Sequence, residues 1–141
     1  MDKAYYRVYT DAGSRGNPGI AAAATVLLDD EGKLVDFNGH FLGIQTNNIA
    51  EYEGILLGVK LALSHKISYL HCIMDSELVI KQINREYKVK DQRLLEKWNE
   101  LQALRKNFTD ITFGHVLRKE NAHADKLVNI ILDTYHGTST H

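Results

Sequence analysis

The sequence has little of what secreted, membrane-bound and zinc-binding proteins need. It contains 141 residues and one cysteine, Cys72, so no internal disulfide can form and no Cys-x-x-Cys pair exists. No apolar run approaches the roughly 18 residues of a membrane-spanning helix. The first ten residues do not resemble a signal peptide, and the seven histidines lack the spacing of zinc ligands. These absences predict a cytoplasmic protein with neither a membrane segment nor bound zinc.

The chain also lacks a large excess of charge of either sign. Its net charge is −1, which argues against a non-specific nucleic-acid-binding protein. The charges are unevenly distributed, however. Ten basic and five acidic residues lie between Lys81 and Lys119, a net charge of +5, and the rest of the chain is acidic, at −6. Such a basic segment is either a solvated face or a surface that follows phosphates opposite an acidic metal site.

The pattern of apolar residues predicts an α/β protein with one mixed sheet. We expect residues 1–135 to form a single domain and residues 136–141 to form a flexible tail. The order β-β-β-α-β-α-α-β-α predicts three antiparallel strands followed by β-α-β crossovers, hence a five-stranded mixed sheet with helices on both faces. Strands are expected at 4–10, 20–28, 33–42, 68–74 and 110–116. Helices are expected from an N-cap at Asn47 or Asn48 to Leu63, and at 76–85, 92–106 and 122–134.

Four carboxylates stand at the ends of these predicted elements. Asp11 and Asp75 are placed where two strands end, and Glu51 and Asp125 lie in or near the first turns of two helices. Each alone has an ordinary explanation as a surface turn, a helix cap or a partner of the helix dipole. Together they predict a site for two hard divalent cations, which bind carboxylate oxygens and can activate water for phosphodiester cleavage. The glycine-rich turn at 12–19 would let a polyanion approach the backbone beside Asp11.

The chain resembles type 1 ribonuclease H over nearly its whole length. Four segments carry the resemblance: Thr10-Asp11 with Gly16-Asn17-Pro18-Gly19, Thr46 to Glu51, Met74-Asp75-Ser76, and Glu120 to Leu127. The resemblance implies a ribonuclease H-like fold and endonucleolytic hydrolysis of the RNA strand of RNA–DNA hybrids, leaving 5′-phosphate and 3′-hydroxyl ends with little sequence preference. It also implies two Mg²⁺ or Mn²⁺ ions per active site. A monomer is the expected oligomeric state.

The resemblance also implies roles for individual residues. The metal ligands of the family correspond to Asp11, Glu51, Asp75 and Asp125. The residues that contact RNA correspond to Asn17, Asn47 and Asn48, and to the backbone of Ala12, Gly13 and Ser14. Thr46 matches a position that binds a phosphate of the DNA strand. An asparagine amide donates and accepts hydrogen bonds, as a 2′-hydroxyl does, so asparagines suit a surface that distinguishes RNA from DNA.

Two cations are candidates for one further role near Asp125. His115 lies ten residues before Asp125, where the family often has a histidine that aids product release or proton movement. The loop after it lacks the usual flexible glycine. If the strand continues through Val116, His115 is a fixed core histidine, and Arg118 is the alternative cation near the scissile phosphate.

The chain departs from the best-known members of the family in its basic surface. Only the short segment from Arg85 to Arg93 separates the two middle helices, where those members carry a long basic insertion. No separate hybrid-binding domain precedes Asp11, so we expect a lower hybrid affinity or compensation by another region. Two other functions remain open: a catalytically silent binding or regulatory module, and another nuclease of this fold, such as a junction resolvase. The four acids and the asparagine segments favour the hybrid nuclease.

Overall fold

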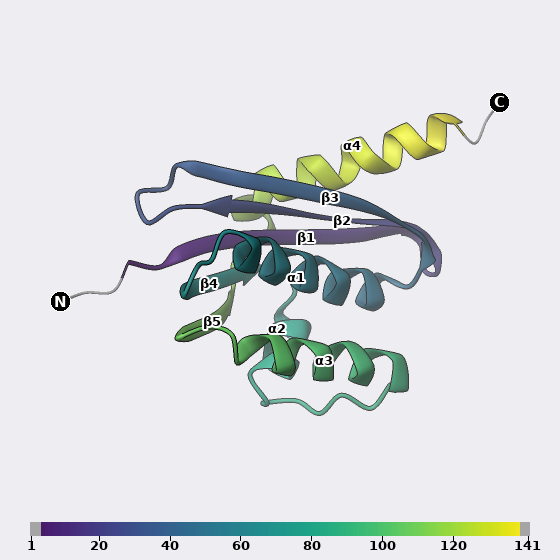
Figure 1. Cartoon of the computed structure of the whole chain (residues 1–141). Helices are drawn as coiled ribbons and strands as arrows, with labels where there is room; N and C mark the ends of the chain where they lie inside the picture. The colour runs from purple at the N-terminus through teal and green to yellow at the C-terminus, as the bar shows by residue number, and fades with distance from the viewer. Residues whose placement is uncertain (1–3, 139–141) are drawn as a thin grey trace.

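One five-stranded mixed sheet organises the structure, a computed structural model that describes residues 4–138 and the side chains of residues 4–135 (Figure 1). The strands lie in the order β3-β2-β1-β4-β5. They are β1 (Tyr6–Gly16), β2 (Gly19–Leu28), β3 (Leu34–Gln45), β4 (Tyr69–Met74) and β5 (Asp110–His115). The first three strands pair antiparallel, whereas β4 pairs parallel with both β1 and β5. The predicted mixed sheet and element order are confirmed.

Helices cover both faces of this sheet, as predicted (Figure 1). On one face lie α1 (Asn47–Ser64), α2 (Glu77–Ile83) and α3 (Gln92–Arg105). On the other face a short 3₁₀ helix, η1 (Arg118–Asn121), leads into α4 (Ala122–Thr138), which packs along β1, β2 and β3. Within residues 4–138, no helix is both long enough and apolar enough to cross a membrane.

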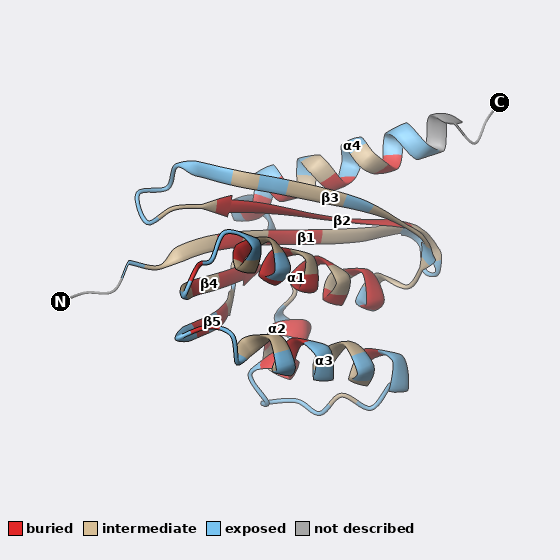
Figure 2. Ribbon diagram, viewed as in Figure 1, coloured by how far each residue is buried: buried red, intermediate tan, exposed pale blue. Residues whose placement is uncertain are grey.

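Small residues in the central strands let both layers of helices approach closely. Figure 2 shows β2 buried along most of its length, and Ala21 to Ala24 are at most 1% exposed. Ala22 and Ala24 face α4, where they pack with Val128 and Leu132. The larger core lies on the other face, between the sheet and α1, α2 and α3. Because this face carries the larger aliphatic and aromatic side chains, it supplies most of the apolar burial that stabilises the fold.

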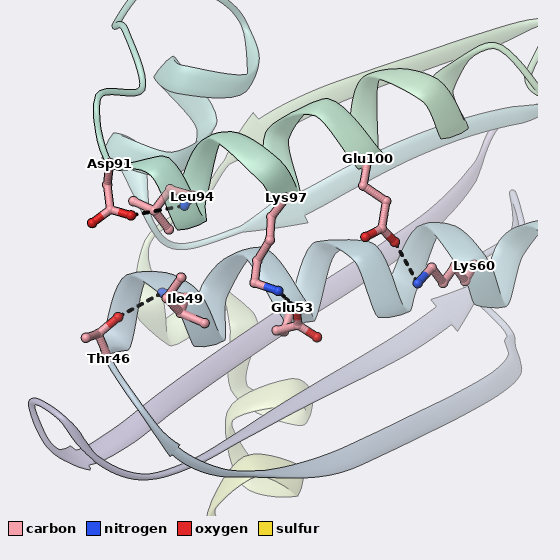
Figure 3. Close-up of polar contacts among 8 residues, drawn as sticks. All are labelled: Thr46, Ile49, Glu53, Lys60, Asp91, Leu94, Lys97 and Glu100. Atoms are coloured by element: carbon pink, nitrogen blue, oxygen red, sulfur yellow. Dashed lines mark hydrogen bonds and ion pairs between the residues drawn. The ribbon is translucent and has the colours of Figure 1, made fainter.

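Two ion pairs link α3 to α1, and each helix begins at its own side-chain cap, Thr46 for α1 and Asp91 for α3 (Figure 3). Lys60 Nζ lies 2.8 Å from Glu100 Oε2, and Lys97 pairs with Glu53 nearer to the N-termini of both helices. The indole N–H of Trp98 donates to the backbone carbonyl of Gln82 at 3.0 Å, and the ring packs on the core. Trp98 therefore joins α3 to the larger core as a partly buried residue.

Several boundaries differ from the predicted ones. The N-cap of α1 is Thr46 rather than Asn47 or Asn48: its backbone is extended and its hydroxyl accepts from the Ile49 N–H at 3.3 Å. The strand β1 continues to Gly16, because the segment predicted as a turn pairs with β2 as far as Gly16 and Gly19.

The last strand and helix differ as well. The strand β5 ends at His115, and α4 runs to Thr138, four residues beyond its predicted end. The predicted flexible tail, residues 136–141, lies entirely outside the residues whose side chains the structure describes, and its flexibility stays a prediction.

Candidate active site

The four predicted carboxylates line one cavity of about 390 Å³. Asp11 belongs to β1 and Asp75 directly follows β4, and these two strands run parallel side by side. Asp11 was predicted to end its strand, but β1 continues past it to Gly16. Asp11 nevertheless lies beyond the last β1–β4 pair, Tyr9 with Ile73. The space beside it is therefore open to Asp75. Glu51 enters from α1 and Asp125 from the first turn of α4, so four separate elements meet here.

Burial and mutual repulsion make two of these carboxylates hard to ionise. Asp11 is only 7% exposed. Its burial, with the nearby charge of Asp75 and a contact to Asp125, raises its pKa to about 8. Burial likewise raises the pKa of Glu51 to about 7. Hydrogen bonds from Ser76 and Asn47 oppose this rise and the charge of Asp75 adds to it.

Little positive charge offsets this acidic cluster. Arg118 Nη2 lies 3.6 Å from Asp125 Oδ1, and 81% of its side chain is exposed. A set of oxygen donors that repel one another is the chemistry that hard divalent cations such as Mg²⁺ require. As the side chains stand, no three histidine, cysteine, aspartate or glutamate residues in the described part of the chain are arranged to hold a metal ion. The residues fit such an ion in kind, and the carboxylates would have to draw together around it.

The predicted substrate-contact residues divide between this cavity and a second one. Ala12, Gly13, Ser14 and Asn47 line the acidic cavity. The second cavity, of about 240 Å³, is lined by Asn17, Thr46, Asn48, Ile49, Asp91, Arg93 and Leu94. The side-chain amide oxygen of Asn17, Oδ1, accepts from the backbone N–H of Asn47 at 3.0 Å, which ties the β1–β2 turn to the start of α1. The seven predicted substrate-contact residues thus lie at or near the N-terminal end of α1.

The two candidate cations occupy different positions. Arg118, in η1, lines the acidic cavity beside Asp125. His115 is exposed at the end of β5, and the strand does not continue through Val116. The hypothesis of a fixed core histidine is therefore wrong, because nothing buries the ring.

Sequence reasoning missed three residues of the site. Asn121 is 1% exposed, and its side-chain amide donates to the backbone carbonyl of Thr10 at 2.8 Å. Arg15 lines the acidic cavity and pairs with Asp133 of α4 at 2.6 Å. Arg93 lines the second cavity. The position of Asn121 within the segment Glu120 to Leu127 was the one available signal, whereas the other two depend on distant contacts.

Comparison with known proteins identifies the family. The family model described as reverse transcriptase-like matches residues 9–130. Ribonuclease HI of Halobacterium salinarum is 36% identical over 125 residues, which cover 89% of this chain and 63% of that protein. The crystal structure of RNase H1 from this archaeon has a TM-score of 0.90 at 35% identity, covering 92% of this chain and 98% of that one. The chain belongs to the type 1 ribonuclease H family.

Two further relatives extend the comparison within the ribonuclease H family. LC11-RNase H1, whose structure was determined in complex with an RNA/DNA hybrid, has a TM-score of 0.87 at 34% identity, covering 92% of this chain and 98% of that one. The bifunctional protein Rv2228c of Mycobacterium tuberculosis is 36% identical over 127 residues, which cover 89% of this chain. The chain spans only 35% of the length of that protein. The ribonuclease H-like fold predicted from the sequence is confirmed.

Proposed function

We propose that this protein is an endoribonuclease that hydrolyses the RNA strand of RNA–DNA hybrids, with little sequence preference and with 5′-phosphate and 3′-hydroxyl products. The observation that carries the proposal is the convergence of Asp11, Glu51, Asp75 and Asp125 in one cavity beside the asparagines at the start of α1. The structure of LC11-RNase H1 with an RNA/DNA hybrid supports the choice of substrate.

The four carboxylates are proposed to hold two divalent ions, Mg²⁺ or Mn²⁺. The ribonuclease H family depends on divalent metal ions. When bound, such ions activate a water and stabilise the departing oxygen in phosphodiester cleavage. The role of the protein is to supply ionised carboxylate oxygens, because a carboxyl group must lose its proton before it coordinates a metal ion. Asp11 and Glu51, whose pKa values are raised to about 8 and about 7, therefore release protons as the site fills.

The start of α1 and the β1–β2 hairpin are proposed to bind the hybrid. Asn17, Asn47 and Asn48 are positioned to meet 2′-hydroxyls and base edges across the minor groove. The backbone of Ala12 to Ser14 follows the RNA strand past the carboxylates. Thr46 uses its hydroxyl oxygen as the α1 cap, so its hydroxyl hydrogen is the group that would donate to a phosphate of the DNA strand.

We further propose that the protein acts in the cytoplasm as a monomer. The only cysteine, Cys72, is buried and free, which fits a reducing compartment. The large apolar side chains of the core pack within one chain, so the fold needs no second copy.

Cleavage of an end-labelled RNA–DNA hybrid, compared with duplex RNA and duplex DNA, tests the proposed function. The reactions contain Mg²⁺, Mn²⁺ or a chelator. The variant Asp75→Asn removes a proposed metal ligand without changing side-chain shape. Glu100→Gln, on α3 and away from the cavity, is the matched control.

We expect metal-dependent cutting of only the RNA in the hybrid. Asp75→Asn should lose about a hundredfold or more in rate, because several kcal/mol of transition-state stabilisation depend on the metal site, and Glu100→Gln should cleave normally. Near-normal cleavage by folded Asp75→Asn protein would show that the carboxylate site is misassigned. Hybrid binding without cleavage under either metal would favour a catalytically silent binding module.

A further inference from the structure

The sheet face that carries Asp11 continues past the acidic cavity onto β4 and β5. Alternate residues of a strand share a face, so Arg7 and Tyr9 lie on the same side as Asp11. Tyr5 lies just before β1, and its ring contacts that of Tyr69. The helix α4 packs along β1, β2 and β3 on this side, whereas β4 and β5 extend beyond it (Figure 1). In the parallel register, Arg7 pairs with His71, which pairs with Thr112. A strip of sheet surface thus leads from the carboxylates to the N-terminal ends of β1 and β4.

Aromatic rings make up much of this strip, and their neighbours hold them in place. The rings of Tyr5 and Tyr69 meet edge to face, with centroids 5.5 Å apart. The hydroxyl of Tyr5 donates to Asp110, the first residue of β5. His71 Nδ1 lies 2.6 Å from the hydroxyl oxygen of Thr112. The strip is therefore an ordered aromatic surface whose rings are half-buried.

A glycine gives the imidazole of this strip its room. A Cβ atom at Gly114 would stand 3.2 Å from His71 Cε1, so the ring lies against the bare backbone of β5. Burial and the charge of Arg7 lower the pKa of His71. The lowered pKa favours the uncharged form of a flat ring, the kind of group on which a base can stack.

Basic groups border the strip on the side of α4. Arg7 extends toward the turn between β2 and β3, where its Nη2 would be 3.3 Å from a Cβ atom at Gly32. Gly32 lines a shallow cavity of about 440 Å³ whose wall on α4 includes His123 and Lys126. Arg7 of β1 and Lys126 of α4 therefore lie along one border of the aromatic surface, next to the acidic turn at residues 29–31, and they are the cations that a phosphate backbone would meet there.

We propose that this strip, made of Tyr5, Arg7, Tyr9, Tyr69, His71 and Thr112, binds a single-stranded stretch of nucleic acid that continues from a hybrid held in the acidic cavity. The proposal rests on the proposed function, because the cavity supplies the hybrid. Single strands bind where bases stack on aromatic rings and basic groups follow the phosphates, and exposed sheet faces stack bases in this way. Asp11 and Asp75 are the next residues on this face after Tyr9 and Ile73, so the cavity and the strip adjoin. A strand that leaves the cavity for the strip passes over η1, whose Asn121 is bonded to the Thr10 carbonyl.

Fluorescence anisotropy in the presence of a chelator, which prevents cleavage, tests the proposal. The probes are a labelled blunt hybrid, the same hybrid with a short single-stranded RNA extension, the same hybrid with a DNA extension, and each single strand alone. The double variant Arg7→Gln/Tyr69→Val removes a charge and a ring while keeping a strand-forming residue. Lys60→Gln removes one charge from α1, on the opposite face, and serves as the matched control.

We expect an extension to tighten binding of the hybrid by about tenfold, a modest fraction of what stacking of a few bases can supply. The RNA and DNA extensions show which strand the strip prefers. The double variant should lose this gain and still cleave the blunt hybrid at the normal rate, and Lys60→Gln should keep the gain. If the double variant does not fold, Arg7→Gln alone should reduce the gain and its dependence on salt.

The proposal is overturned if neither extension tightens binding, or if the gain survives in folded double-variant protein. These results differ from failure of the proposed function. A protein that cleaves the blunt hybrid but ignores both extensions contradicts only the strip. A protein that cleaves no hybrid, yet binds single strands in a way that the double variant abolishes, contradicts only the proposed activity.

Discussion

The side-chain amide of Asn121 donates a 2.8 Å hydrogen bond to the backbone carbonyl of Thr10, which lies 111 positions earlier in the chain. The bond is buried, and it joins the residue before Asp11 to the residue before α4. Asp125 lies in the first turn of that helix. The distance between Asp11 and Asp125 therefore depends on this contact, although Asn121 itself does not line the acidic cavity.

Replacing Asn121 with alanine should weaken both the fold and the site. The change leaves the Thr10 carbonyl buried without its partner, which costs about 1–3 kcal/mol in the free energy of unfolding. It also frees the start of α4, so kcat for hybrid cleavage should fall more than KM rises. Denaturant unfolding and steady-state kinetics measure the two effects. Asn107→Ala, which removes an exposed amide at the end of α3, should stay near wild type, and unchanged stability of Asn121→Ala would contradict the role of the bond.

The contact between Asn121 and Thr10 is a feature that the sequence could not predict, whereas features that depend on local sequence could be predicted. The order of the elements follows from runs such as Ala21 to Ala24, whose small apolar side chains predict a strand buried on both faces, as observed. The four acids were identified because each belongs to a short local segment that resembles the ribonuclease H family. Local patterns of this kind need no knowledge of the tertiary fold.

Features that depend on distant partners could not be predicted in this way. Thr46, Asn47 and Asn48 are all good N-caps, and only the extended backbone at Thr46 distinguishes among them. The length of β1 depends on pairing with β2 through Gly16, and the segment itself is typical of a turn. Arg15 reaches Asp133 across 118 positions, and no local pattern links the two.

A second prediction concerns the close contact between α1 and the sheet. A Cβ atom at Gly58 would stand 2.8 Å from Thr10 Cγ2 and 2.9 Å from Thr25 Oγ1. Gly58→Ala should therefore lower the free energy of unfolding by about 1–3 kcal/mol through overpacking, despite a gain in helix propensity of about 1 kcal/mol. Thermal or denaturant unfolding measures the change. Lys60→Ala, on the exposed side of the same helix, should have a much smaller effect, and a Gly58→Ala variant as stable as wild type would show that α1 can move away from the sheet.

A third prediction concerns pH in the absence of metal. The pKa values of Asp11 and Glu51 are about 8 and about 7 in the folded protein, against about 4 for carboxyl groups in an unfolded chain. Between about pH 4 and about pH 8, the folded state therefore binds more protons than the unfolded state. The free energy of unfolding should fall as the pH rises from about 4 to about 8, by a few kcal/mol in all.

Thermal unfolding across this pH range, with chelator and with Mg²⁺, measures the dependence. Mg²⁺ should raise the Tm more at high pH than at low pH, because protons compete with the ion for the same oxygens. Asp11→Asn should flatten the pH dependence in chelator, since it removes the most strongly shifted carboxyl group. A chelated wild-type protein whose stability rises steadily from pH 5 to pH 8 would contradict the repulsion inferred among these groups.

The last prediction separates Arg118 from His115. Arg118 lines the acidic cavity and its guanidinium lies 3.6 Å from Asp125, whereas His115 is exposed at the end of β5. Arg118→Gln should lower kcat by roughly tenfold or more through loss of a cation near the developing charge. It should leave the unfolding free energy nearly unchanged, because 81% of the side chain is exposed. His115→Gln should cost less activity.

The Mg²⁺ dependence distinguishes a direct effect of Arg118 from simple damage to the metal site. The guanidinium competes with a cation for Asp125, so Arg118→Gln should reach half-maximal activity at an equal or lower Mg²⁺ concentration while kcat falls. Damage to the carboxylates would instead raise the concentration that is needed. If His115→Gln lowers kcat more than Arg118→Gln, the histidine must act on the substrate from the end of β5, and the proximity of Arg118 to Asp125 would be a feature of the metal-free protein alone.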